Sequence, residues 1–415
     1  MKIGLIGFGQ AGGKIADTII KDAKEWPSTC ITSHFAINTA ESDLEGLNNI
    51  PEERQILLDE KIDSDNGNIS GGNGVGADNH LGAIVCKEQI GTIDSGLTTV
   101  NKQQTDAFVI VTALGGGTGS GGTPVLAQHI NYTYPDMPVY VIGVTPTQSE
   151  GNVYVENTLE SMKTVQQYVN GLFLVGNDSF RYSDEPISDL YERVNRTIAQ
   201  RLLTLLAAGE VSSDGPAAHP ESVLDTAEIV NSVSKDGFTT LCHAQETQSN
   251  TEKSVLGTLF SRSTSNDNEN DHVVDYLDTA DSDNTLLSLT KEAVNNNNSF
   301  EADISTADSA LMLVTGDSDR FSQDELEASV SWLENKTNNA QVRTGDRPAD
   351  IDKVSVLVLI SGLNKSSKLS QFMQSINPDL DLSDKKTSQN VRKLLTTEQP
   401  ETTVDEDIDK IAGLF

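Results

Sequence analysis

The chain has 415 residues, of which 36% are hydrophobic and 5% aromatic, enough for two or three globular domains. It carries 62 acidic against 29 basic residues, and this net charge of −33 disfavours binding to nucleic acid or to an anionic membrane through a basic face. The acidic residues are spread along the whole chain, which is typical of a halophilic cytoplasm, where molar salt screens their mutual repulsion.

The cysteines and the hydropathy pattern exclude further classes. Cys30, Cys86 and Cys242 lie far apart and in no ligand spacing, which disfavours a disulfide framework and a zinc site. No apolar run approaches the ~20 residues that span a bilayer. We therefore expect a cytoplasmic protein with reduced thiols, no direct membrane insertion and no nucleic-acid partner.

The chain opens with a strand, a glycine turn and a helix. The strand is Lys2 to Ile6, and the turn carries Gly7, Gly9 and Gly12 in a G-x-G-x-x-G pattern, which dinucleotide-binding domains share. A dinucleotide site needs an acidic residue at the end of the next strand, where this chain has Asn38. An NAD-binding Rossmann enzyme is therefore disfavoured, and the loop is not a Walker A sequence.

A second glycine loop, residues 114–124, follows an apolar strand at 107–112 and precedes a helix at 125–130. Glycines there let backbone N–H groups approach a phosphate, and the helix N-terminus adds partial positive charge. A flexible Gly/Ser linker is the alternative, but linkers rarely stand between a buried strand and a helix. Binding of a nucleotide phosphate is the function that this loop predicts.

A third glycine cluster spans residues 71–79 and can be read in two ways. It is either a surface loop or part of the same site, and its Asp78 either caps the following helix or faces a metal–phosphate group. Two further predicted strands, at 139–144 and 172–175, are followed by Glu150 and Asn177. Open α/β sheets bind ligands at such carboxyl ends, where Asn38 also lies.

A long amphipathic helix is predicted from Ile187 to Ala208, ended by Gly209. Its apolar stripe consists of Ile187, Leu190, Val194, Ile198, Leu202 and Leu205. On another face Tyr191 and Asn195 are four residues apart and project together. They either stack on a base and bind its edge or are ordinary surface residues.

Farther along, Asp225 and Glu228 stand three residues apart at a predicted helix start. Such a pair is either an N-cap with a dipole-stabilising acid or a means to orient and polarise a water. Strands at 310–314 and 354–360 around a helix at 323–333 then predict a smaller α/β unit. The polar stretch 246–284 reads as a mobile insertion.

Beyond about Lys365 the sequence becomes acidic and predicts a disordered tail. Apolar residues recur in its last twelve positions at spacings of three and four. They either form a short helix on a partner protein or belong to a frayed terminus.

The central loop Gly115–Gly121 resembles the G-G-G-T-G-S-G signature of the tubulin/FtsZ superfamily, and residues 7–14 and 74–79 are most similar to its archaeal CetZ family. The resemblance covers roughly residues 1–365. It implies an α/β fold with a Rossmann-like GTPase domain built on a parallel sheet, a long central helix and a smaller α/β C-terminal domain. The implied units are 1–186, 187–209, 210–365 with the insertion 246–284, and a tail at 366–415.

The resemblance also implies the ligands, GTP or GDP with Mg²⁺, and Asp78 near the γ-phosphate and the magnesium. The implied nucleotide contacts are Gly9, Gln10, Ala11, Gly12, Gly13, Lys14, Asn38, Gly76, Ala77, Asp78, Gly115, Gly116, Gly117, Thr118, Gly119, Ser120 and Pro146, with Glu150 on the ribose and Asn177, Tyr191 and Asn195 on the guanine.

In this family Asp225 and Glu228 match an acidic loop that reaches the nucleotide of the next subunit. The resemblance therefore implies a GTPase activated by self-assembly into head-to-tail filaments, with a role in cell shape or motility. Paralogous subunits are possible further partners. Val223 and Tyr154 stand where FtsZ proteins usually carry Asn and Arg, which argues against a division FtsZ. The alternative is a non-hydrolysing, nucleotide-binding scaffold or co-polymer subunit.

Overall fold

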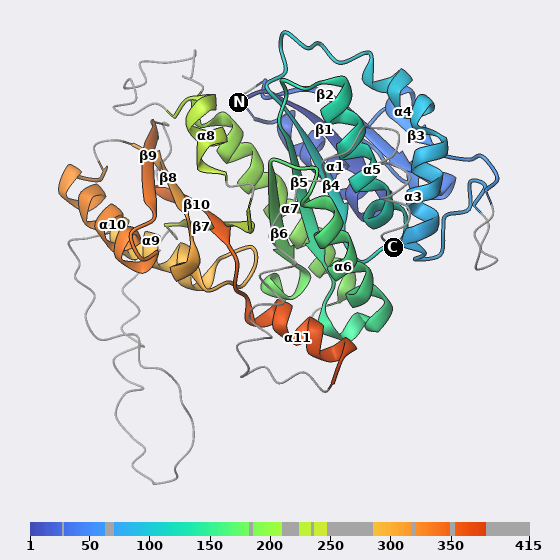
Figure 1. Cartoon of the computed structure of the whole chain (residues 1–415). Helices are drawn as coiled ribbons and strands as arrows, with labels where there is room; N and C mark the ends of the chain where they lie inside the picture. Colours follow the sequence, from blue (N-terminus) through green and yellow to red (C-terminus); the bar gives the residue numbers. More distant parts are fainter. Residues whose placement is uncertain are drawn as a thin grey trace.

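The structure, a computed structural model, describes residues 1–26, 29–62, 70–181, 186–209, 224–233, 236–246, 285–317, 320–348 and 353–378. They form one ten-stranded sheet with helices packed on its faces (Figure 1). Within these ranges no helix is both long and apolar enough to cross a membrane. The predicted insertion at 246–284, apart from Glu246, lies outside the described residues, as do Val223 and the part of the predicted tail at 366–415 that follows residue 378.

The first six strands of the chain pair in parallel in the order β3-β2-β1-β4-β5-β6. They are β1 Ile3–Phe8, β2 Ile31–Asn38, β3 Gln55–Leu57, β4 Ala107–Ala113, β5 Val139–Thr145 and β6 Gly171–Gly176. Most are buried on both faces, as expected of apolar parallel strands covered by helices. Because Phe8 pairs with both Ile37 and Thr112, β1, β2 and β4 end at one edge.

The remaining strands continue the same sheet in the order β7-β10-β8-β9. They are β7 Phe238–Gln245, β8 Ser309–Gly316, β9 Gln341–Pro348 and β10 Ser355–Leu363. β10 runs antiparallel to β7 and to β8, and a single pair, Phe173 with Thr239, joins β6 to β7. The smaller α/β unit expected from the sequence is present, while β7 and β9 were not predicted.

Helices cover both faces of the sheet. They are α1 Gly9–Ala23, α2 Glu41–Glu45, α3 Asn79–Glu88, α4 Ile90–Leu97, α5 Thr118–Thr133, α6 Asn152–Val165, α7 Ile187–Leu206, α8 Thr226–Ser232, α9 Thr285–Asn296, α10 Gln323–Lys336 and α11 Ser367–Ile376. Short 3-10 turns are η1 Glu52–Arg54, η2 Gln148–Glu150, η3 Asn177–Phe180, η4 Ala207–Gly209 and η5 Ile304–Thr306.

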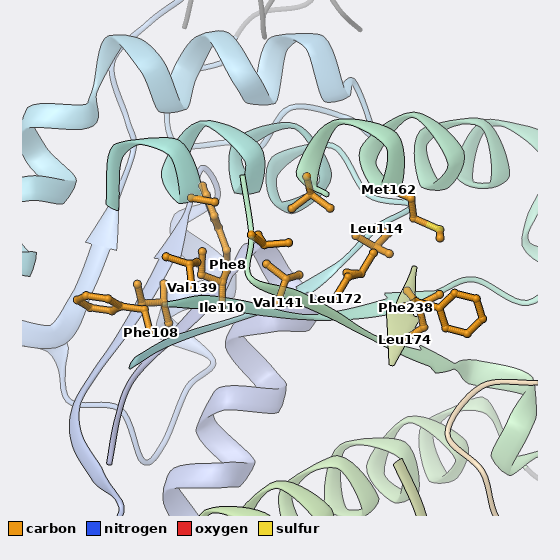
Figure 2. Close-up of a cluster of buried hydrophobic side chains, with 14 of the residues drawn as sticks. Phe8, Phe108, Ile110, Leu114, Val139, Val141, Met162, Leu172, Leu174 and Phe238 are labelled. Carbon is orange, nitrogen blue, oxygen red and sulfur yellow. The ribbon is translucent and has the colours of Figure 1, made fainter. Parts of the chain in front are cut away.

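Two apolar cores lie on the two sides of the sheet. Alternate residues of β1 divide between them: Leu5 joins the core under α1 and α7, whereas Phe8 joins the core under α3, α5 and α6. Figure 2 shows the second core, where Phe108, Ile110 and Met162 lie between the strands and the covering helices. The loops after β1 and β4 are thus carried by strands that are fixed on both sides.

The central helix confirms the predicted long amphipathic element, with α7 and η4 together spanning Ile187 to Gly209. Leu190, Val194 and the later apolar residues of the stripe are buried. The prediction that Ile187 belongs to the buried stripe is wrong, because this residue is 68% exposed at the first position of the helix and lies outside both cores.

The prediction of a disordered tail over residues 366–415 is wrong for residues 367–376. Residues 367–376 form α11, which packs against α6, with Leu369 and Phe372 buried. Met373 and Ile376 also pack against the core, and the four apolar residues recur at helical spacings of three and four, so the sequence did carry a signal for this helix. Figure 1 shows α11 lying across the end of α6.

Helix α5 contains Pro124, and its neighbour α6 accommodates it. Proline lacks the N–H that would bond the carbonyl four residues earlier, which is that of Ser120. The hydroxyl of Ser161 on α6 donates to this carbonyl instead, at 3.0 Å. The contact fixes α6 beside the start of α5, where the second glycine loop ends.

Candidate active site

A cavity of about 440 Å³ opens at the carboxyl ends of β1, β2 and β4. The three glycine loops of the sequence meet in its wall. Its lining residues are Phe8, Gly9, Gln10, Ala11, Asn38, Ala40, Ser42, Asp43, Asn73, Gly74, Val75, Gly76, Ala77, Ala113, Gly116, Gly117, Thr118, Gly119 and Tyr154. Ten of the predicted nucleotide contacts are among them.

Two helix N-termini point at this cavity. The N-cap positions of α1 and α5 are Phe8 and Gly117, and neither makes a side-chain capping hydrogen bond. The first N–H groups of both helices therefore remain for a ligand, and helix N-termini favour anions. The two loops approach closely, since a Cβ on Gly9 would lie 3.0 Å from the backbone nitrogen of Gly119. This is the geometry of a phosphate cradle.

The third glycine loop closes the cavity from the side. Gly76 and Ala77 both adopt left-handed backbone conformations, with φ of 60° and 64°. For Ala77 this conformation is strained, and such strain occurs often at binding loops. Asp78 caps α3, accepting from the Leu81 N–H at 2.8 Å, so the capping interpretation of Asp78 is correct. Its carboxyl group does not line the cavity.

A residue that the sequence did not reveal, Asn157 of α6, ties two of the loops together. Its side-chain nitrogen Nδ2 donates to the carbonyl oxygens of Ala77 at 2.9 Å, Gly115 at 3.0 Å and Gly116 at 3.1 Å. Three acceptors identify this atom as the amide nitrogen. Asn157 is 6% exposed, so these bonds form away from solvent. It positions the backbone of the cradle.

The end of β2 adds polar groups to the wall. Asn38 donates to Asp43 at 3.2 Å, and Gln10 donates to the other Asp43 oxygen at 2.7 Å. Thr39 and Thr118 share a hydroxyl hydrogen bond of 2.6 Å, which links β2 to the start of α5. Asp43, which the sequence analysis missed, thus places a carboxylate in a wall otherwise suited to anions.

The predicted ribose and base residues gather beside Tyr154, at the edge of the cavity. Glu150 accepts from the Thr147 N–H at 2.8 Å and from Asn177 at 3.4 Å. Tyr191 is 43% exposed, and partial burial, then the nearby Glu150 and Tyr154, raises the pKa of its phenol. Glu150, Asn177 and Tyr191 do not line the cavity itself, but Tyr191 lies near Tyr154, which does.

Two other predicted nucleotide contacts, Asn195 and Pro146, are also absent from the cavity lining. Asn195 is partly buried one turn after Tyr191, and Pro146 is buried at the end of β5. Neither lines the cavity.

Several predicted phosphate contacts do not line the cavity. A Cβ on Gly12 would lie 2.1 Å from the carbonyl oxygen of Val111, so glycine is needed there for α1 to approach β4. Gly13 is buried, Gly115 is tied to Asn157, and Lys14 is exposed. The Ser120 hydroxyl is buried and donates to the carbonyl of Gly116. Gly12, Gly13, Lys14, Gly115 and Ser120 are thus absent from the cavity wall.

Asp225 and Glu228 lie at the opposite edge of the sheet. They form a capping box at the start of α8, in which the Glu228 N–H donates to Asp225 at 2.8 Å and the Asp225 N–H to Glu228 at 3.1 Å. The next residue, Thr226, lies 3.5 Å from the carboxylate of Asp106, just before β4 begins. Figure 1 shows α8 beside the chain N-terminus, where β1 also begins.

No cluster of three or more His, Cys, Asp or Glu side chains that could hold a metal ion occurs in the described ranges. The cysteines Cys30, Cys86 and Cys242 are buried thiols, as expected.

Comparison with known proteins agrees with the glycine loops and the sheet. Residues 2–183 match the GTPase domain of the Tubulin/FtsZ family, and residues 184–377 match the tubulin-like CetZ C-terminal domain. Tubulin-like protein CetZ1 of Haloferax volcanii is 34% identical over 375 residues, which cover 90% of this chain and 91% of that protein. The chain belongs to the tubulin-like CetZ family.

Other CetZ proteins match over comparable lengths. CetZ4 of Haloferax volcanii is 32% identical over 100% of both chains. The solved structure of CetZ2 from Haloferax volcanii, a GTPγS-bound protofilament, has a TM-score of 0.73 at 32% identity and covers 91% of this chain and 98% of that one. An FtsZ dimer from M. jannaschii, 20% identical with a TM-score of 0.61, shares the fold.

This CetZ-family chain is a tubulin-like GTPase of the cytoskeleton. Its GTPase domain contains the cavity. Its C-terminal domain contains β7 to β10, and also α11, because the family match extends to residue 377.

Proposed function

We propose that subunits stack head to tail into filaments and that each bound GTP is hydrolysed between two of them. The observation that carries the proposal is the separation of the phosphate cradle from Asp225 and Glu228. The cradle lies at the carboxyl edge of β4, and Thr226 contacts Asp106 at its amino edge. The seven residues of β4 separate these edges by roughly 23 Å. One subunit cannot bring both groups to the same phosphate.

Stacking resolves this separation, because the amino edge of one subunit then faces the cavity of the next. Such a contact is heterologous and propagates into an open filament. The solved structure of the relative CetZ2, a GTPγS-bound protofilament, supports this arrangement. The contact would bring the carboxylates of Asp225 and Glu228 to the γ-phosphate of the neighbouring subunit.

The expected chemistry is water attack on the γ-phosphorus, which breaks the bond to the bridging oxygen and releases GDP and phosphate. The N-termini of α1 and α5 would hold the phosphates. A carboxylate from the adjacent subunit would orient the water and accept its proton. Glu150, Asn177, Tyr191 and Asn195 would bind the ribose and the guanine.

Mg²⁺ fits this proposal as a companion of the nucleotide. Mg²⁺ keeps several waters and is held by one or two carboxylates together with substrate phosphates, so the lack of a protein cluster in the described part of the chain is compatible with it. Asp43 supplies a carboxylate in the wall, and Asp78 lies at the start of α3 beside it. Magnesium there would neutralise phosphate charge.

The same structure contains an observation that favours the alternative function. Both Asp225 and Glu228 are engaged in a capping box, which they would form in any helix. If capping is their whole role, the chain is a non-hydrolysing scaffold or joins the filament of a paralogue. We favour hydrolysis because Asp225 is exposed and can reach another subunit.

We further infer a cytoplasmic protein acting in cell shape or motility, since the chain is similar to haloarchaeal CetZ proteins over most of its length. The acidic composition supports a halophilic source. The segment from residue 379 onward would be available for a partner protein.

The experiment that tests the function measures GTP hydrolysis per subunit against protein concentration in molar KCl with magnesium, with sedimentation of the same samples. A site shared between subunits predicts turnover that rises together with pelleting above a threshold concentration. Tight GTP binding without turnover or pelleting at any concentration would favour the scaffold.

A further inference from the structure

A lysine from the last described helix is buried beside the predicted guanine site. Lys368 of α11 is 5% exposed, and its ammonium pairs with the carboxylate of Asp178 in η3. The ammonium also lies 5.1 Å from the ring centroid of Phe300 and 5.6 Å from that of Phe372. The paired residues are 190 positions apart in the chain.

The contact fixes the turn that carries Asn177. Asp178 follows Asn177 directly, and Gly176 precedes it at the end of β6. A Cβ on Gly176 would lie 2.5 Å from the Lys368 nitrogen, so the lysine fills the space that the glycine leaves open. The hydrogen bond that the Asn177 side chain donates to Glu150 is long, at 3.4 Å, and by itself would hold the side chain weakly.

We propose that Lys368 is a positioning residue for guanine recognition, and that through it α11 of the C-terminal domain forms part of the nucleotide site. The proposal rests on the proposed function, in which Asn177 binds the base edge. Holding Asp178 and filling the space beside Gly176, Lys368 would keep Asn177 in its binding position. It touches no reacting atom itself.

Stability alone does not account for a buried ammonium at this place. Taking a lysine out of water is costly, and burial lowers the pKa of Lys368 against the opposing influence of Asp178. Replacing such a group with an apolar residue of similar length is often neutral for stability. The partner Asp178 keeps a side chain that is 40% exposed, so it would be hydrated when the lysine is gone.

The test compares Lys368→Met with Lys365→Met in the full chain, in molar KCl with magnesium. Lys365 lies three residues earlier and pairs with Asp303 at 2.6 Å, but its side chain is 59% exposed, whereas that of Lys368 is buried. The measured quantity is the ratio of the dissociation constants for ATP and GTP, together with the melting temperature. We expect Lys368→Met to lower this ratio by at least about tenfold and Lys365→Met to leave it unchanged.

A merely structural lysine would change the melting temperature and leave the ATP-to-GTP ratio as in the wild type, and that result would overturn the proposal. If Lys368→Met does not fold, Asp178→Asn provides the second measurement, since it removes the other half of the pair. An unchanged ratio in Asp178→Asn would equally overturn it. Failure of the wild-type protein to bind GTP would instead contradict the proposed function.

Discussion

Asn157 on α6 donates a hydrogen bond from Nδ2 to the carbonyl oxygen of Ala77, 2.9 Å away. Through its further bonds to Gly115 and Gly116, one buried amide holds the second and third glycine loops in a single arrangement. The third loop also reaches α6 through Asn79, whose side chain donates to Glu160 at 3.0 Å. Asn157, a residue outside both loops, is the side chain that joins one loop to the other.

Replacing Asn157 with alanine is expected to weaken GTP binding by about tenfold, because three carbonyl groups lose their donor and the loops separate. Equilibrium titration with GTP measures the change. Asn131→Ala is the matched control, since that amide donates to the Tyr168 carbonyl at 2.5 Å at the far end of α5. Equal GTP affinity in the Asn157→Ala and Asn131→Ala variants would contradict this role.

Gly116 offers a way to block the cradle without disturbing the fold. A Cβ at this position would meet no atom within 4 Å, and the residue lines the cavity. We expect Gly116→Val to abolish GTP binding while the melting temperature stays near that of the wild type. Gly91→Val, at a second open position outside the cavity, should leave binding intact. Normal GTP affinity in Gly116→Val would refute the phosphate cradle.

The corresponding change at Gly117 is less informative. A Cβ there would lie 2.6 Å from the Val75 side chain and 2.9 Å from the backbone nitrogen of Asp78. A bulkier residue at Gly117 should therefore also abolish binding, but by displacing the third glycine loop.

Glu228→Gln separates capping from catalysis. Glutamine still accepts the capping hydrogen bond but cannot take a proton from water. We expect GTP affinity within about twofold of the wild type, turnover lower by about 100-fold and longer-lived filaments. The control is Glu325→Gln, the same change in the capping box that Ser322 and Glu325 form on α10. Unchanged turnover in Glu228→Gln would remove this residue from the catalytic role.

Stability should fall in mild acid because of a histidine on β7. Burial, followed by the nearby Arg201, lowers the pKa of His243 from 6.5 to about 4. Between these values the unfolded chain binds a proton that the folded chain does not. The free energy of unfolding is therefore highest above pH 6.5 and declines as the pH falls toward 4. The expected loss is about 3 kcal/mol.

Chemical denaturation in molar KCl across this pH range measures the loss. His34, whose pKa is also lowered, contributes a decline of the same sign. The informative quantity is therefore the difference from His243→Gln, which should show a shallower decline. Parallel profiles for the two proteins would contradict the assignment to His243.

Much of the fold could be predicted because its parallel strands are continuous apolar runs. β4 and β5 carry this signal plainly, and both are buried along almost their whole length. β9 does not, because it pairs on one side only at the end of the sheet and its sequence, QVRTGDRP, is largely polar. Helix α11 could have been predicted, since Leu369, Phe372, Met373 and Ile376 recur at helical spacings before the acidic sequence begins.

The candidate site divides in a similar way. The glycine loops were visible in the sequence because backbone approach to a ligand needs that composition locally. Asn157 and Lys368 were not, since their partners lie 41, 80 and 190 residues away in the chain. A single polar residue in a helix becomes meaningful only when the fold supplies its partner.

The most direct measurement of the split site mixes two inactive proteins. Gly116→Val retains Asp225 and Glu228 but should not hold GTP, and Glu228→Gln binds GTP without the carboxylate. We predict that each alone hydrolyses GTP at no more than about a hundredth of the wild-type rate. An equimolar mixture, confirmed by co-sedimentation, should recover turnover at interfaces that combine the two intact halves. A mixture that pellets together yet remains inactive would contradict a site completed by the neighbouring subunit.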